Sequence, residues 1–127
     1  MRTTFVTEVF SDLLGKGRLN LTDELLVVAG GHAERDLFQT LGFEKATITN
    51  LDSVEASEQL APYRWAHEDA QSLSYSDRSF PWVVVVDGLH HCRSPHRALT
   101  EMYRTCSVGV IAIEARDSWL MRLAVRL

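Results

Sequence analysis

An apolar run at residues 82–86 ends abruptly in polar groups. The run reads Trp-Val-Val-Val-Val, and the next five residues are Asp, Gly, Leu, His and His. An uninterrupted run rich in β-branched residues is typical of a parallel strand that is buried on both faces. Because ligands in open α/β sheets bind beyond the carboxyl ends of the strands, Asp87, His90 and His91 become candidate site residues.

A helix and a second apolar strand are predicted after this run. Ser94 and Pro95 begin a stretch in which apolar residues recur at helical spacing, namely Ala98, Leu99, Met102 and Tyr103. Residues 108–113 are again apolar and predict a strand. A strand, a crossover helix and a second strand form a βαβ unit, in which the two strands are parallel.

The earlier part of the chain predicts the same alternation. Apolar residues between 5 and 14 recur at helical spacing until Gly15 and Gly17 end the pattern, so we expect residues 1–24 to form a capping helix and a linker. The elements expected next are a strand at 25–29, a helix at 33–41, a strand at 47–52, a helix at 53–60 and a strand at 63–67. This alternation favours an α/β fold with a doubly wound parallel sheet over residues 25–127.

The composition fits one globular domain without a membrane span. The chain has 127 residues, of which 46% are hydrophobic and 24% are charged. Its net charge of −4 argues against binding to nucleic acid or anionic lipid by bulk electrostatics, so we expect a small-molecule or protein partner. No apolar run approaches the ~20 residues that cross a membrane. The two cysteines form no disulfide framework, so we expect a cytoplasmic protein.

Five motifs follow one another in the order and spacing of a known family. They are Leu-Leu-Val-Val-Ala-Gly-Gly-His-Ala at 25–33, Asp52, Glu-Asp-Ala-Gln-Ser-Leu at 68–73, Ser-Phe-Pro-Trp-Val-Val at 79–84 and Asp-Gly-Leu-His-His at 87–91. Together they resemble the class I S-adenosylmethionine-dependent methyltransferases, and most closely the small-molecule branch called type 11. The resemblance implies a Rossmann-like, partial domain at 25–127 that binds S-adenosylmethionine and a small-molecule methyl acceptor.

The resemblance assigns a turn of the cofactor site. Ala29, Gly30 and Gly31 match a glycine-rich turn whose backbone N–H groups approach the methionine part of the cofactor. The family has an acid at the position of Val27 and glycines at the positions of Ala29 and Ala33, so the chain departs from the pattern there. The alternative interpretation is a plain strand-to-helix turn without a ligand.

Three acids and one alanine complete the expected cofactor site. The resemblance implies that Asp52 accepts hydrogen bonds from both ribose hydroxyls, that Asp69 accepts one from the adenine amino group, and that Ala70 lies against the ring. Asp87, in the motif after the fourth strand, is assigned to the cofactor as well. From the residues alone, Asp52 before Ser53 is equally a helix-entry residue, and Asp69 is equally a solvated loop acid.

His90 and His91 lie where the family faces the transferring methyl group, and we expect them to be catalytic. Methyl transfer from a sulfonium depends mainly on positioning, and an imidazole can also remove the acceptor's proton near neutral pH. Alternatively, one histidine is a surface residue and the other packs without chemistry. The histidine and cysteine spacing fits no standard zinc site, so we expect no metal.

The C-terminal end departs from the family. Class I methyltransferases continue with further strands, whereas this chain ends after a segment in which an apolar stripe lies beside arginines. We therefore expect a sheet that is incomplete at its C-terminal end. The chain is then a fragment, a truncated relative or a homo-oligomer whose partner covers the edge strand. The stripe indicates a helix that lacks its normal packing partners, or alternatively a helix on a membrane surface.

Two functions remain open at this point. The first is S-adenosylmethionine-dependent methyl transfer to a small molecule, by this chain or by a larger enzyme of which it is the cofactor-binding portion. The second is a non-catalytic binding or interaction module that keeps the fold and has lost the cofactor turn. A nicotinamide-dependent oxidoreductase is less favoured, because the turn lacks the G-x-G-x-x-G spacing.

Overall fold

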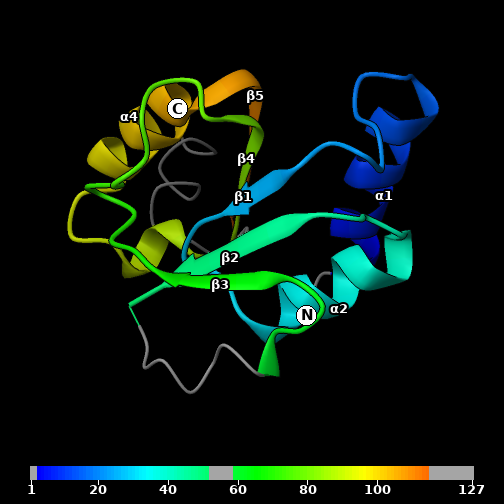
Figure 1. Cartoon of the computed structure of the whole chain (residues 1–127), viewed down its shortest axis with the longest axis horizontal. Helices are drawn as coiled ribbons and strands as arrows, with labels where there is room; N and C mark the ends of the chain where they lie inside the picture. Colours follow the sequence, from blue (N-terminus) through cyan, green and yellow to red (C-terminus); the bar gives the residue numbers. More distant parts are fainter. Residues whose placement is uncertain (1–2, 52–58, 115–127) are drawn as a thin grey trace, which may run out of the picture.

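The fold is a five-stranded parallel sheet with helices on both faces (Figure 1). The computed structural model describes residues 3–51 and 59–114. The strands are β1 (Leu25–Val27), β2 (Ala46–Asn50), β3 (Arg64–His67), β4 (Phe80–Val86) and β5 (Cys106–Ile113), in the spatial order β3-β2-β1-β4-β5. The predicted doubly wound sheet is confirmed, and so is the position of β4 between the parallel strands β1 and β5.

The chain changes direction across the sheet between β1 and β4. Leu25 pairs with Ala46 of β2 on one side and with Trp82 of β4 on the other. From β1 the chain builds outward through β2 to β3, and it then crosses back to add β4 beside β1. Crevices beyond the carboxyl ends of the strands at such a switch point are the usual ligand sites of open α/β sheets.

Both faces of the central strands are buried, which explains their uninterrupted apolar runs. Helices α1 (Thr3–Gly15) and α2 (His32–Leu41) cover one face, and α4 (Pro95–Thr105) covers the other (Figure 1). Val84 belongs to the core under α1 and α2, whereas Val83 and Val85 belong to the core under α4. Successive side chains of a strand point to opposite faces of the sheet, so a strand that is buried on both faces needs apolar residues at successive positions.

The first helix packs on the sheet through aromatic side chains. Phe10 of α1 contacts Phe38 of α2, with ring centroids 5.2 Å apart, and Phe38 contacts Phe43 at 5.7 Å. Phe10 and Phe38 are completely buried, and burial of such a side chain stabilises the fold by about 1.5–3 kcal/mol.

The division of the chain into parts 1–24 and 25–127 stays a prediction.

Several element boundaries differ from those expected. β1 ends at Val27 rather than at residue 29, because Ala29 adopts a left-handed backbone with a φ of 50°. β5 begins at Cys106, directly after α4, and its next two residues, Ser107 and Val108, are exposed, so no apolar pattern marks the start. A short 3-10 helix, η1 (Leu89–His91), was not predicted. Most of the helix expected at 53–60 lies outside the described residues.

Within the described part of the chain, no helix combines the length and the apolar character that crossing a membrane requires.

Candidate active site

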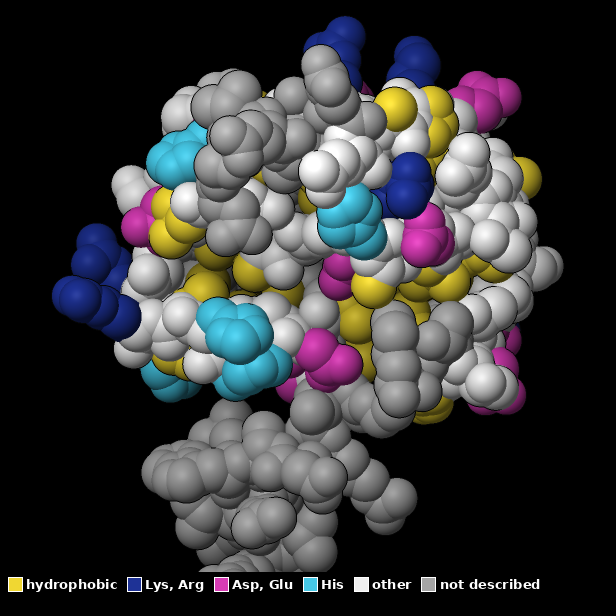
Figure 2. All heavy atoms as spheres, turned by 90° about the horizontal axis from the view of Figure 1, so that it is seen from below, with side chains coloured by type: hydrophobic (Ala, Val, Ile, Leu, Met, Phe, Trp, Pro, Cys, Tyr) yellow, Lys and Arg dark blue, Asp and Glu magenta, His cyan; other side chains and the backbone are white. Residues whose placement is uncertain are grey.

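A cavity of about 390 Å³ opens at the carboxyl ends of the strands. Its walls come from the residues after β1, the end of β2, the turn after β3 and the end of η1, and they consist of Ala29, Gly30, Asn50, Leu51, Glu68, Asp69, Ala70, Gln71, His91 and Cys92. Ligand cavities of proteins commonly have volumes of about 300–1,000 Å³. Figure 2, seen from below, shows histidine and acidic side chains beside recesses lined by hydrophobic ones.

The turn after β1 forms one wall and is fixed by neighbouring strands. Gly30 N donates to the carbonyl of Thr49 at 3.0 Å, and Asn50 Nδ2 donates to the carbonyl of Gly30 at 2.8 Å. A Cβ atom on Gly30 would lie 2.7 Å from Cγ1 of Val27, so only glycine fits there without a shift. Ala29 and Gly30 therefore present a close backbone wall to the cavity.

Gly31 directs its amide toward the protein. It precedes α2, and its N–H donates to Glu34 Oε2 at 2.8 Å. Burial raises the pKa of the Glu34 carboxyl; this hydrogen bond opposes the rise, and the charge of Asp87 adds to it. Asp87 follows β4 with a φ of 54°, and neither Gly31 nor Asp87 is part of the cavity wall. The amides of both turn glycines are thus engaged within the protein.

The end of β2 contributes an amide that the sequence analysis missed. Asn50 is the last residue of β2 and lies on the cavity wall. Besides its bond to Gly30, it accepts a hydrogen bond from Trp65 Nε1 of β3 through Oδ1 at 3.2 Å. The only signal in the sequence was its place at the end of an apolar strand pattern. Asp52, the expected ribose ligand, lies outside the described residues.

The turn after β3 carries two of the expected residues into the cavity wall. Asp69 Oδ1 accepts a hydrogen bond from Gln71 N at 2.9 Å, which closes a tight turn. No described residue donates a hydrogen bond to the other carboxylate oxygen, Oδ2. Ala70 is buried beside Asp69. Glu68 and Gln71 also line the cavity, although the sequence analysis did not single them out.

The two candidate catalytic histidines differ in position. His91 lies on the cavity wall, whereas His90 does not. The backbone N–H of His90 donates to Glu114 Oε1 at 3.1 Å, and its ring Nδ1 lies 3.9 Å from Glu114 Oε2. Cys92, also on the wall, has a thiol whose pKa is raised by burial and by the charges of Asp69 and Glu114. Glu114 therefore holds η1 at its middle residue, His90, and the next residue, His91, lies on the cavity wall.

The described residues contain no cluster of three or more His, Cys, Asp or Glu side chains placed to hold a metal ion.

Residues 27–113 match the family model described as a methyltransferase domain. The chain belongs to this methyltransferase family. The match runs from Val27, the last residue of β1, to Ile113, the last residue of β5. It includes every cavity residue named above, and the expected resemblance is confirmed. No curated protein matches the chain.

Solved structures share the fold of this methyltransferase-family chain. A Bacillus halodurans protein provisionally described as a methyltransferase is 18% identical, with a TM-score of 0.68 over 91% of this chain and 55% of its own. An S-adenosylmethionine-dependent methyltransferase from Methanosarcina mazei is 22% identical, with a TM-score of 0.66 over 89% of this chain and 62% of its own. The present chain therefore spans less than two thirds of the length of these proteins.

Proposed function

We propose that this chain binds S-adenosylmethionine in the cavity and serves the transfer of its methyl group to a small-molecule acceptor. The observation that carries this proposal is the cavity itself, whose walls follow β1, β2, β3 and η1 at the switch point of a methyltransferase-family sheet. Its volume of about 390 Å³ suits a ligand of nucleoside size. Asp69, the acid that we assign to the adenine amino group, lies on the cavity wall beside the apolar Ala70.

The residues assigned to the cofactor have the following roles. Asp69 accepts a hydrogen bond from the adenine amino group through Oδ2, and Ala70 packs against the ring. Ala29 and Gly30 contact the methionine part, and Asp52 is assigned to the ribose. Gly31 and Asp87 support the turn without contacting the ligand. Gly31 N donates to Glu34, the charge of Asp87 acts on Glu34, and neither residue lies on the cavity wall.

His91 is the residue we assign to the acceptor. The bound cofactor supplies a methyl group that is already activated on a sulfonium, so the protein's main contribution is positioning. An imidazole on the cavity wall can accept the proton of the acceptor near neutral pH. His90, fixed to Glu114, sets the position of η1 and hence of its neighbour.

A non-catalytic binding module is the second candidate, and two observations favour it. The amides of Gly30 and Gly31 donate to Thr49 and Glu34 instead of pointing to a ligand. Ala29 also holds a left-handed backbone that favours glycine. Such a turn offers fewer contacts to the cofactor than a turn with open amides.

Incubation with methyl-labelled S-adenosylmethionine and a metabolite extract separates the two candidates. Retained label on the protein in equilibrium dialysis and label transferred to small molecules support the enzyme. Retention without transfer, under conditions in which a known methyltransferase labels the same extract, supports the cofactor-binding portion of a larger enzyme. Neither retention nor transfer by the folded chain contradicts the proposed cofactor binding and supports the module.

We further propose a cytoplasmic protein that self-associates. Both cysteines, Cys92 and Cys106, are free thiols, as is usual in a reducing compartment.

The self-association involves the edge strand β5. β5 is at one edge of the described sheet, and residues 106–113 include neither a charged residue nor a proline. Val108 on this strand is 63% exposed. Unprotected apolar edge strands favour pairing with another strand, here that of a second copy.

A further inference from the structure

The loop that carries the cavity residue Asp69 is attached to α4 by several hydrogen bonds. Arg78 N donates to the carbonyl of Arg104, the penultimate residue of α4, at 2.9 Å. Arg104 Nη1 donates to Asp77 Oδ1 at 2.9 Å. The side chain of Leu73 is buried in the core between α4 and the sheet. The loop between β3 and β4 thus takes its position from α4.

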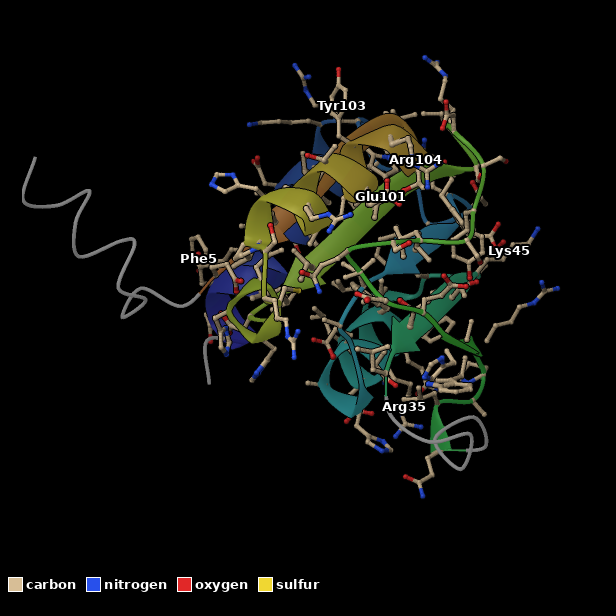
Figure 3. The ribbon with its side chains drawn as sticks, turned by 90° about the vertical axis from the view of Figure 1, so that its left-hand side faces the viewer. Phe5, Arg35, Lys45, Glu101, Tyr103 and Arg104 are labelled. Atoms are coloured by element: carbon tan, nitrogen blue, oxygen red, sulfur yellow. The ribbon has the colours of Figure 1, made fainter. Side chains whose placement is uncertain are left out.

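Two side chains of α4 hold both peptide groups of Leu73. Leu73 N donates to Glu101 Oε1 at 2.9 Å, and Arg104 Nη2 donates to the carbonyl of Leu73 at 3.1 Å. The two side chains also pair with each other, with Arg104 Nε 2.7 Å from Glu101 Oε2. Figure 3 shows both extending from α4. We call these two residues the Leu73 bracket.

The ion pair within the Leu73 bracket is partly shielded from water. The side chain of Glu101 is 18% exposed and that of Arg104 is 30% exposed, whereas that of Asp77 is 75% exposed. The hydrogen bonds from Arg104 lower the pKa of Glu101, so the carboxylate stays ionised at neutral pH. Asp77 is therefore the outer contact of Arg104, and Glu101 is the inner one.

Gln71 connects the same loop to the start of α4. Its Oε1 accepts a hydrogen bond at 2.7 Å from the backbone N–H of Ser94, the residue that caps α4. Its own backbone N–H donates to Asp69 Oδ1. The turn that begins with Asp69 and Ala70 is consequently attached to one helix at two residues that follow them, Gln71 and Leu73.

We propose that Glu101 and Arg104 are positioning residues for adenine recognition. Through Leu73 they fix the turn that begins at Asp69, so that Oδ2 of Asp69 meets the amino group of the base, although neither residue lies on the cavity wall. The inference rests on the proposed binding of S-adenosylmethionine in this cavity. A small displacement of Asp69 lengthens this hydrogen bond and removes the selectivity for adenine.

The test compares two probes, S-adenosylhomocysteine and its hypoxanthine analogue, which lacks the amino group. The unmodified chain binds the adenine compound more tightly, by about tenfold or more for a hydrogen bond to a charged acceptor. In Glu101→Ala this preference falls toward unity, because the affinity for the adenine compound falls more than the affinity for the analogue. In Glu101→Gln, which keeps an oxygen for Leu73 N, the preference is intermediate.

Asp77→Ala is the matched control, since it removes only the outer contact of Arg104 and should leave the preference intact. Circular dichroism confirms that each variant is folded, and Glu101→Gln serves if Glu101→Ala does not fold. A folded Glu101 variant with the full preference overturns the positioning role and leaves the proposed cofactor binding in place. An unmodified chain that binds neither probe overturns both, and one that binds both equally overturns the adenine contact of Asp69.

Discussion

Ala29 and Gly88 meet at the switch point between β1 and β4. A Cβ atom on Gly88 would lie 2.7 Å from Cβ of Ala29 and 3.0 Å from its carbonyl oxygen. Such distances are shorter than carbon atoms tolerate, and the backbone of Ala29 cannot retreat because the next residue is hydrogen-bonded to β2. Gly88 is therefore the residue that lets the chain after β4 pass the turn after β1.

Gly88→Ala is expected to lower the free energy of unfolding by about 1–3 kcal/mol, as overpacking of a close contact does. Urea unfolding followed by circular dichroism measures the change. Gly31→Ala is the matched control, because a Cβ at Gly31 has no atom within 4 Å and its backbone is extended. Equal unfolding midpoints for the two variants would show that the contact is not tight.

Ala29→Gly is expected to stabilise the fold or leave it unchanged. A left-handed backbone costs an L-residue roughly 1–2 kcal/mol, and glycine offsets part of the gain through its greater freedom in the unfolded chain. The same substitution at the exposed helical residue Ala33 should lower the free energy of unfolding by about 0.5–1 kcal/mol. A fall in the urea midpoint of Ala29→Gly that equals or exceeds the fall in Ala33→Gly would refute the strain at Ala29.

Glu34 gives the stability a measurable pH dependence. Its native pKa is raised by burial, so the native state holds this proton more tightly than the unfolded state does. The resulting stabilisation is complete below the unfolded pKa of about 4.3 and is lost as the pH rises through the native pKa. Glu34→Gln, which keeps an acceptor for Gly31 N, lacks this loss.

The difference in unfolding free energy between Glu34→Gln and the unmodified chain should therefore grow in favour of Gln from about pH 4.5 to about pH 7.5. Urea titrations at these two values measure it. The reverse trend, or a constant difference, would mean that the carboxyl is not buried in the native state.

The parallel sheet and its ligand edge could be predicted because their signals are local. The apolar runs of β1 and β4 reflect burial on both faces, and the residues that follow a strand necessarily lie at its end. Ala29, Gly30, Asp69, Ala70 and His91 accordingly lie together on one cavity wall. Their roles toward a ligand stay predictions.

The remaining features of the site depend on contacts between distant residues. His90 faces Glu114 rather than the cavity, and these residues are 24 positions apart in the chain. Asn50 lines the cavity because its amide bridges Gly30 and Trp65 from two other segments. No local pattern specifies which of two adjacent histidines a 3-10 turn will direct inward.

Self-association through β5 predicts a concentration-dependent sedimentation coefficient. Val108→Lys places a charge on the exposed part of the edge strand and should shift the chain toward the monomer. Phe5→Lys replaces an exposed apolar residue on α1 and serves as the control. A monomer at all concentrations, or an equal shift by both variants, would rule out this edge as the interface.

Calorimetric titration of the folded chain with S-adenosylhomocysteine tests cofactor binding in the cavity most directly. We expect one site per chain, and a Kd that rises roughly ten- to a hundredfold in Asp69→Asn, because a hydrogen bond to a charged acceptor contributes about 1.5–3 kcal/mol. The asparagine keeps an oxygen for Gln71 N, so the turn is preserved. No binding by the folded, unmodified chain, or equal Kd values for the two proteins, would contradict the proposed site.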